Sequence, residues 1–294
     1  MFIVDFFGGL GNQMFQYAFL KKLEIKYPQT KIISFIYDQY NSCHNGFELE
    51  KIFNIKLEQS TLKDWTYLSD FYPVGAKFYT VLNKLFAMRR VCFGPKSSCI
   101  MIDDQSCYYP EVFALNPLKS YCFHGVWQNT EYFNDIKDII TNAFSFKKEL
   151  DKNNTDLLKR IKVSNSVSIH IRRGDYLNYD KSYLLDRDYY LKAIDLIKSR
   201  VKDSTYFVFS DDIQAAKEIL KGIDNVVFIN NNSGTSSYID MQLMTNCKHN
   251  ITANSTFSFW GAYLNNSPEK LVIAPKKTFN NNKVPLSCKE WTLI

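Results

Sequence analysis

Short apolar runs alternate with amphipathic stretches through the second half of the chain. The runs with the length and composition of buried strands cover residues 167–171, 206–209, 225–229, 250–253 and 271–274. The stretches with helical periodicity cover residues 187–201, 212–221 and 238–247, and another starts near residue 256. Strands and helices that alternate at this spacing predict a parallel sheet with helices on both faces. We therefore expect this half to be a doubly wound α/β domain.

The first half starts with the same succession of strand, turn and helix. The apolar run 3–7 leads through a glycine-rich turn into residues 12–20, which are apolar around most of the circumference of a helix. This pattern predicts a helix buried on several sides. Other expected elements are strands at 31–36 and 121–126 and helical pieces at 60–90 and 129–144. The polar segment 147–165 is the best domain boundary, so the domains are expected at 1–155 and 156–294.

Composition and charge exclude several classes of protein. Hydrophobic residues make up 46% of the chain, which excludes a disordered protein. Lys and Arg outnumber Asp and Glu by 36 to 30, too mild a surplus for a dedicated nucleic-acid binder. Seven scattered cysteines form no Cys-x-x-Cys pair, so we expect free thiols and no bound metal. Without a signal peptide or a run of about 18 apolar residues, a cytosolic protein with at most peripheral membrane association is expected.

The strongest cluster of chemically active residues ends the first strand of the second half. Strand alternation places His170 and Arg172 on one face, side by side. Gly174 permits a sharp turn that brings Asp175 back toward them. A guanidinium is the natural bidentate partner of a phosphate, and Arg172 together with Arg173 fits a diphosphate. A structural ion pair between an Arg and an Asp is the alternative.

A second cluster, Ser210, Asp211 and Asp212, directly follows the strand 206–209. Paired acids occur in metal-dependent nucleotide-sugar sites of the D-x-D type, but these two are adjacent and point in alternate directions. One acid is expected to contact a base or a ribose hydroxyl, and the other to cap the following helix. Capping alone is the alternative.

A third cluster, Asn254, Ser255, Thr256 and Phe257, joins a strand to an aromatic helix. The backbone N–H groups and the dipole at a helix N-terminus favour anions, and the two hydroxyls can donate further hydrogen bonds to a phosphate. Phe257 either packs in the core or stacks on a ligand. The cluster therefore predicts an anion site.

The turn Gly8-Gly9-Leu10-Gly11 permits close approach to a ligand, or serves only as a tight strand–helix turn. It is not a dinucleotide fingerprint, because Met14 stands in the place of the third glycine and Ser34 where an acid would end the next strand. It also lacks the Gly-Lys-Ser/Thr of a P-loop. An NAD-dependent dehydrogenase is therefore excluded.

Six stretches, in this order, carry a resemblance to a known family. They are Gly8-Gly-Leu-Gly-Asn-Gln-Met-Phe-Gln-Tyr-Ala18, Gly125-Val-Trp-Gln-Asn129, His170-Ile-Arg-Arg-Gly-Asp-Tyr176, Phe209-Ser-Asp-Asp212, Cys247-Lys-His-Asn-Ile-Thr-Ala-Asn-Ser-Thr-Phe-Ser258 and Ile273-Ala-Pro-Lys-Lys277. Over nearly its whole length the chain resembles the bacterial α-1,2-fucosyltransferases of glycosyltransferase family 11.

The resemblance implies a GT-B architecture, in which two Rossmann-like α/β domains face a cleft. The N-terminal domain would take the acceptor and the C-terminal domain the donor, GDP-β-L-fucose. Fucose would be transferred with inversion to the 2-hydroxyl of a terminal β-galactoside, as in O-antigen synthesis, without a metal or another cofactor. The tail 276–294 is a candidate to pack back on the N-terminal domain, as GT-B tails often do.

The resemblance also implies roles for particular residues. Donor-binding residues would be Gly9, Gly11, Asn12, Gln13, His170, Arg172, Arg173, Ser210, Asp211, Asn254, Ser255, Thr256 and Phe257. Arg172 is expected to stabilise the departing β-phosphate, and Asp211 to recognise guanosine. Arg173, on the other face, either braces its loop or reaches the donor from outside. Trp127 and Gln128 are expected to line the acceptor site.

The general base is the open point of this mechanism. Asp175 and His170 are the candidates, although an oxocarbenium-like transition state with a well-stabilised leaving group needs no strong base. Two other functions stay open at this stage. One is a GDP-fucose-dependent transferase of another linkage, and the other is a non-catalytic glycan- or nucleotide-binding module.

Overall fold

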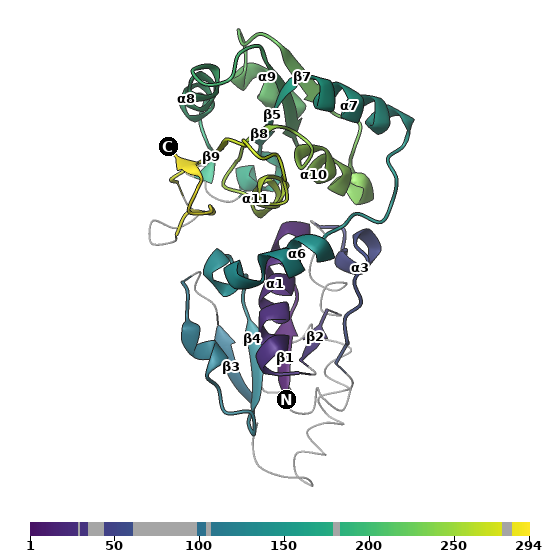
Figure 1. The fold of residues 1–294 in the computed structure, drawn as a ribbon, viewed down its shortest axis with the longest axis vertical. Coiled ribbons are helices and arrows are strands. Elements are labelled where there is room, and N and C mark those ends of the chain that lie inside the picture. The colour runs from purple at the N-terminus through teal and green to yellow at the C-terminus, as the bar shows by residue number, and fades with distance from the viewer. Residues whose placement is uncertain (29, 35–43, 61–98, 104–106, 179–182, 278–283) are drawn as a thin grey trace. The chain divides into compact units, whose positions relative to one another are not determined.

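The protein, analysed as a computed structural model, folds into two compact units (Figure 1). The structure describes residues 1–28, 30–34, 44–60, 99–103, 107–178, 183–277 and 284–294. The first unit comprises 1–42, 46–50 and 55–143, and the second comprises 43–45, 51–54 and 144–294. Most of the helical region predicted at 60–90 lies outside the described residues.

The first unit is built on a four-stranded parallel sheet. Its strand order is β2 (Lys31–Ile33), β1 (Phe2–Asp5), β4 (Ser120–His124) and β3 (Cys99–Asp103). The chain passes from β1 to β2 on one side and comes back through β3 to β4 on the other. The strand order therefore reverses between β1 and β4. The strands predicted at the start of the chain, at 31 and at 121 are confirmed, whereas β3 was not predicted.

Helix α1 (Leu10–Lys26) follows β1 and is buried on several sides, as the sequence predicted. Phe19 of α1 stacks on Trp127 with ring centroids 3.7 Å apart. The remaining elements of this region are α3 (Leu49–Ile52), η1 (Pro110–Phe113), η2 (Thr130–Tyr132), η3 (Asn134–Ile136) and α6 (Lys137–Ala143). The helix expected at 129–144 is thus three short pieces, because Phe133 adopts an extended φ of −144° that interrupts the helical hydrogen bonds.

The second unit contains a six-stranded parallel sheet. Its order is β10 (Thr292–Leu293), β9 (Val272–Ala274), β8 (His249–Ile251), β5 (Asn165–Ile171), β6 (Ser204–Ser210) and β7 (Val226–Ile229). Numbered from β5 as the first strand, this is the order 3-2-1-4-5-6 of a doubly wound Rossmann sheet, read from the β7 edge. The α/β class predicted for this half is confirmed.

Alternate residues of the central strands point into two separate cores. Val167, Ile169 and Ile171 of β5 pack with α8 (Arg187–Lys198) and α9 (Ile213–Ile219) on one face. Phe207 and Phe209 of β6 pack on the other face with α7 (Lys152–Val163) and α10 (Tyr238–Met244). Both faces are therefore covered, and His170 and Arg172 fall on the face opposite to the β5 apolar residues, as predicted.

The division between the units lies before the predicted boundary. The long continuous part of the second unit starts at Phe144 and includes α7, which is amphipathic and buries Leu157 and Ile161 in the core of this unit. The boundary predicted at 155/156 would cut this helix. The end of the chain belongs to the second unit, where β10 adds an edge strand to β9.

Among the described residues, no helix combines the length and the apolar character that crossing a membrane requires.

Candidate active site

The polar clusters of the second half meet where the second sheet reverses its order, between β5 and β8. Arg172 follows β5 and Asn254 follows β8, and these strands are neighbours. Tyr176 links them, because its hydroxyl donates to the Asn254 carbonyl at 3.2 Å and its ring centroid lies 5.4 Å from the Arg172 guanidinium carbon. Ligands of open parallel sheets bind outside the carboxyl ends of strands at such a reversal. The geometry therefore places the candidate site here.

His170 is a buried and uncharged member of this site. Only 5% of its surface is exposed, and its ring centroid lies 5.7 Å from that of Phe257. Burial, and to a smaller extent the charge of Arg172, lowers the pKa of the imidazole to about 3. Its Nδ1 has no hydrogen-bond partner among the described residues, a state uncommon for a buried polar atom. The ring is therefore a weak proton acceptor, with one nitrogen suited to a ligand.

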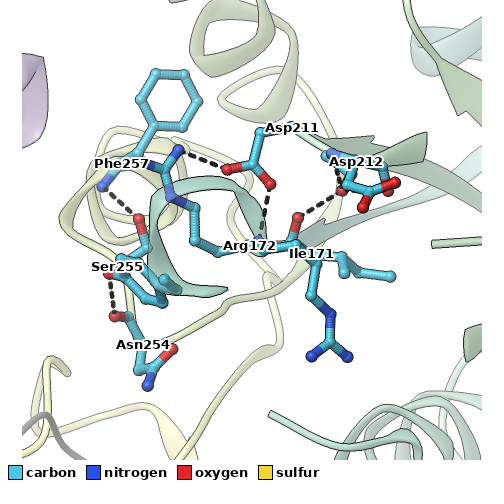
Figure 2. A network of polar contacts seen from close by, with 10 residues as sticks. Ile171, Arg172, Asp211, Asp212, Asn254, Ser255 and Phe257 are labelled. Atoms are coloured by element: carbon cyan, nitrogen blue, oxygen red, sulfur yellow. Dashed lines mark hydrogen bonds and ion pairs between the residues drawn. The ribbon is translucent and has the colours of Figure 1, made fainter. Parts of the chain in front are cut away.

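Arg172 is paired with an acid from the neighbouring strand. Its Nη1 lies 2.9 Å from Asp211 Oδ2, and the two side chains are 26% and 25% exposed. The other oxygen of Asp211 accepts a hydrogen bond from the backbone N–H of Arg173 at 2.8 Å. Figure 2 shows this carboxylate facing the guanidinium. Asp211, expected to recognise guanosine, thus holds Arg172 in place at the edge of the sheet.

Gly174 was expected to permit a sharp turn, but in the structure its lack of a side chain makes room for the carboxylate of Asp211. A Cβ atom there would lie 2.5 Å from Asp211 Oδ2, so only glycine lets the carboxylate approach this closely. Arg173 donates from its guanidinium to the carbonyl of Leu185 at 2.9 Å and so braces the loop. Asp175 lies in the 3₁₀ turn η4 (Gly174–Asn178), and its side chain is outside the described part of the structure.

Ser210 ends β6, and Asp211 and Asp212 follow it. One of these two acids was expected to cap the next helix. Asp212 caps α9, since its carboxylate accepts from the Ala215 N–H at 2.9 Å. The Ser210 hydroxyl donates to the carbonyl of Ile171 at 2.7 Å and accepts from the Asp212 N–H. Ser210 therefore ties the ends of β5 and β6 together, and its contact with a donor stays a prediction.

Helix α11 (Thr256–Tyr263) begins next to the end of β8. Ser255 is its N-cap, and its hydroxyl accepts from the Phe257 N–H at 3.3 Å (Figure 2). Asn254 is buried, and its amide donates to the carbonyl of Tyr183 at 2.7 Å. Thr256 and Phe257 are half-buried. The predicted strand-to-helix junction is confirmed, with the helix N-terminus on the edge of the sheet that carries Arg172.

The glycine turn of the first unit is tight for a steric reason. Gly8 has a φ of +75°, and a Cβ atom there would lie 2.5 Å from the side-chain nitrogen of Asn12. Gly9 caps α1 and Gly11 is buried within it. The half-buried Gln128 donates to Asn12 Oδ1 at 3.0 Å, so two of the residues predicted to face the substrates lie together.

Two other residues predicted to contact substrates are enclosed by the protein. Gln13 has no exposed surface, and its amide donates to the carbonyls of Gly8 and Gly46 and accepts from the Glu48 N–H. Trp127 also has no exposed surface, and it packs on Phe19 in the core. In this structure Trp127 therefore offers an acceptor no surface, contrary to its predicted place in the acceptor site. Gln128 beside it remains a candidate.

A buried polar network joins the segment after β7 to α7 and α10, and the sequence patterns did not predict it. Asn232 donates to Asp240 at 2.7 Å and also to the buried Asn154 of α7. Burial raises the pKa of the Asp240 carboxyl to about 7, although the hydrogen bond from Asn232 acts in the opposite direction. The sequence held one signal, an acid in the first turn of a helix whose other residues are mostly apolar.

The described residues contain no group of three His, Cys, Asp or Glu side chains arranged to hold a metal ion.

The fold and the site define an α/β protein in which an arginine and a helix N-terminus lie at the carboxyl edge of a Rossmann sheet. A family model described as "Glycosyl transferase family 11" matches residues 1–294, and the chain belongs to this family.

Known relatives agree with this assignment. The chain is 30% identical over 310 residues to the O-antigen biosynthesis glycosyltransferase WbnK of Escherichia coli, with 97% of each chain covered. It is 34% identical over 287 residues to an α-1,2-colitosyltransferase of Escherichia coli, and the alignment covers 94% of this chain and 92% of the relative. Over 189 residues it is 30% identical to galactoside α-(1,2)-fucosyltransferase 1 of Rattus norvegicus, covering 53% and 49%.

A solved structure shows the same fold. The α-1,6-fucosyltransferase NodZ, soaked with GDP-fucose, superposes with a TM-score of 0.50 at 12% sequence identity, covering 90% of this chain and 92% of NodZ. The predicted GT-B class of fold is confirmed.

Proposed function

We propose that the protein transfers L-fucose, with inversion, from GDP-β-L-fucose to the 2-hydroxyl of a terminal β-galactoside, in the synthesis of O-antigen or another surface glycan. Among the named relatives, one acts in O-antigen biosynthesis and one is a galactoside α-(1,2)-fucosyltransferase. The observation that carries the proposal is the convergence of Arg172, neutral His170 and the α11 N-terminus at one reversal of strand order.

In this reaction the bond from C1 of fucose to the diphosphate breaks, and its electron pair passes to the β-phosphate. The acceptor oxygen bonds to C1 from the opposite side, which turns the β-linked donor into an α-linked product. The charge that develops on the leaving group needs fixed positive partners. Arg172, oriented by Asp211, and the N–H groups that begin α11 would supply them without a metal ion.

The acceptor would be held by the first unit, where Gln128 presents a half-buried amide that is hydrogen-bonded to Asn12, a residue expected to face the donor. Amide side chains both donate and accept hydrogen bonds, as recognition of sugar hydroxyls requires. Much of the chain between residues 36 and 130 lies outside the described residues.

A second donor has a specific observation in its favour. The relative with 34% identity is a colitosyltransferase. Colitose differs from fucose by lacking the 3-hydroxyl, so a site that hydrogen-bonds this hydroxyl would reject GDP-colitose, because its polar groups would stay unpaired.

The test is release of GDP from GDP-fucose and from GDP-colitose, each with lactose as acceptor, with and without EDTA, and the linkage of the product read by NMR. We expect EDTA-resistant turnover of GDP-fucose to an α-1,2 product. Faster turnover of GDP-colitose would show that GDP-colitose, rather than GDP-fucose, is the donor. A rate that falls in EDTA would disprove metal independence. GDP binding without any turnover would favour a binding module.

A further inference from the structure

The starts of three central strands of the second sheet carry an excess of basic residues. The stretches 159–165, 198–204 and 247–249 lead into β5, β6 and β8. Together they contain seven Lys and Arg residues and one acid, Asp203. Their surplus of six equals that of the whole chain, in which 36 basic residues stand against 30 acids. Outside these stretches the charges of the protein therefore balance.

The three stretches lie side by side at the amino edge of the sheet. Asn165 of β5 is in register with Ser204 of β6, and its side-chain amide donates to the carbonyl of Lys202 at 2.9 Å. The side-chain oxygen of Asn165 accepts from Lys248 Nζ at 2.9 Å, which joins the start of β8 to that of β5. Helices α7 and α8 pack on opposite faces of the sheet, and each ends shortly before β5 or β6 begins. The basic residues therefore extend across this edge from one face to the other.

Six of the seven basic residues form a surface that we call the basic edge. They are Arg160, Lys162, Lys198, Arg200, Lys202 and Lys248. The last is half-buried, and the other five are exposed. Within the described part of the chain, Lys159 is the only one of the seven in an ion pair, with Asp156 of its own helix. Val163 lies among these residues with 86% of its surface exposed. The basic edge is thus a set of unpaired positive charges around one apolar side chain.

Helix dipoles explain only part of this surface. The C-terminus of a helix attracts cations, which accounts for basic residues in the last turns of α7 and α8. The other three members, Arg200, Lys202 and Lys248, lie outside helices. Half of the basic edge is therefore placed where no helix terminus requires it.

The flanking strands show no such excess. One Lys and one acid stand in the segment before β7, and the same holds for the segment before β9: Lys221 and Asp224, then Glu269 and Lys270. On α8 a further exposed acid, Asp195, lies about one turn before Lys198. The excess of positive charge is thus confined to the centre of the edge.

We propose that the basic edge docks the protein on a bilayer that contains anionic phospholipids. Clusters of four to eight Lys and Arg residues, about the size of this one, bind such surfaces. Strand starts that are in register lie along a line, which suits a flat partner. An exposed apolar side chain within a ring of cations suits the boundary between head groups and acyl chains. A nucleic acid has no apolar layer to receive Val163.

The basic edge lies at the opposite end of β5 from Arg172, so docking would leave the candidate site uncovered. The inference uses residues of the second unit alone. It does not depend on which sugar the protein transfers.

The test is co-sedimentation with vesicles of phosphatidylglycerol and phosphatidylcholine in equal amounts, and with vesicles of phosphatidylcholine alone. We expect wild type to bind only the anionic vesicles and to be released as the salt concentration rises. The double variant Lys162→Gln/Lys202→Gln should bind them about 25-fold more weakly, from about fivefold for each charge at the surface. Val163→Asn should weaken vesicle binding about threefold and leave binding to a single-stranded DNA oligonucleotide unchanged.

Lys148→Gln/Lys217→Gln is the matched control, because it removes two exposed lysines of the same unit outside the basic edge. It should bind vesicles as wild type does, and an unchanged urea midpoint in every variant shows that the fold is intact. Equal binding of wild type to both kinds of vesicle, or to neither, would overturn the proposal. Equal losses in the two double variants would do the same.

A nucleic acid would replace the bilayer as the partner if the oligonucleotide bound more tightly than the anionic vesicles and Val163→Asn bound vesicles like wild type. Vesicle binding is measured without substrates. Absence of turnover with GDP-fucose would therefore refute the proposed function and leave this result unaffected.

Discussion

Arg172 derives its position from contacts on two sides. Asp211 accepts from its Nη1, and the ring of Tyr176 lies beside the guanidinium. Because the ion pair is about one-quarter exposed, it adds little to stability, of the order of 0–1 kcal/mol. A guanidinium has five N–H donors in a planar fork, which leaves it able to pair with both Asp211 and a phosphate. Its main contribution is therefore expected in the reaction.

Replacing Arg172 by Ala should separate activity from stability. We expect kcat/KM for GDP-fucose to fall by about 10²–10³-fold, as for loss of one charge-stabilising donor, while the free energy of unfolding measured in urea changes by less than about 1 kcal/mol. Arg160→Ala, an exposed arginine on α7, is the control. Unchanged kcat/KM in Arg172→Ala would remove the residue from the mechanism.

Gly174 and Gly222 offer a comparison between crowding and backbone strain. A methyl group at Gly174 would collide with Asp211, whereas at Gly222 it would meet nothing within 4 Å but would strain a φ of +83°. We expect Gly174→Ala to displace Asp211 and lower turnover at least tenfold. Gly222→Ala should cost roughly 1 kcal/mol of unfolding free energy and leave turnover intact. Equal activity of both variants would show that the Asp211 contact is dispensable.

At the scale of elements, the sequence predicted those whose signals are local. The apolar runs of β5 to β9 and the periodicity of α8 to α11 were read correctly, because each short segment carries its own burial pattern. Clusters that immediately follow a strand were found in the same way. The position of Arg172 at the end of β5 could therefore be predicted, but its pairing with Asp211 could not.

The parts that could not be predicted depend on long-range contacts. Oδ2 of Asp5 lies 2.7 Å from Nδ1 of His124, although the two residues are separated by 119 positions. Nothing in the sequence near either residue indicates this contact. Strand β10 has two residues and exists only because β9 is beside it. Trp127 was assigned to the acceptor site from its motif, but its burial depends on Phe19, which lies far away in the sequence. Packing of this kind arises only when the whole unit has formed.

Helices α7 and α10 are joined by a titrating network that predicts a pH effect. Asp240 has a pKa raised from 3.8 to about 7 by burial, so the folded protein holds a proton that the unfolded chain loses. This contribution to stability is fully present below about pH 3.8 and is lost as the pH rises through about 7. Asp240→Asn should flatten the dependence between these values and add about 1 kcal/mol or more at pH 8. Urea unfolding from pH 5 to pH 8 measures this, and an unchanged slope would contradict it.

At the scale of the molecule, each unit has its own parallel sheet and its own reversal of strand order. The proposed function assigns the diphosphate to the second unit. At a GDP concentration 100 times Kd, a ligand stabilises the state that binds it by about 2.7 kcal/mol. We expect GDP to slow hydrogen exchange most at the amides of β5, β6 and β8. The Arg172→Ala variant should show a weaker effect, and slowing confined to β1 and β4 would place the nucleotide in the wrong unit.

The two sheets also differ in whether each strand finds its neighbour already synthesised when it emerges from the ribosome. In the second sheet, β6, β7, β8, β9 and β10 each pair with a strand made earlier, so the sheet can grow outward from β5 as the chain lengthens. In the described part of the first sheet, β3 pairs with β4 alone, and β4 is made later. A nascent chain that ends before β4 therefore has a β3 without its neighbour, and unpaired strand edges promote aggregation. We therefore expect the nascent chain to be most prone to aggregation in the interval of synthesis between β3 and β4.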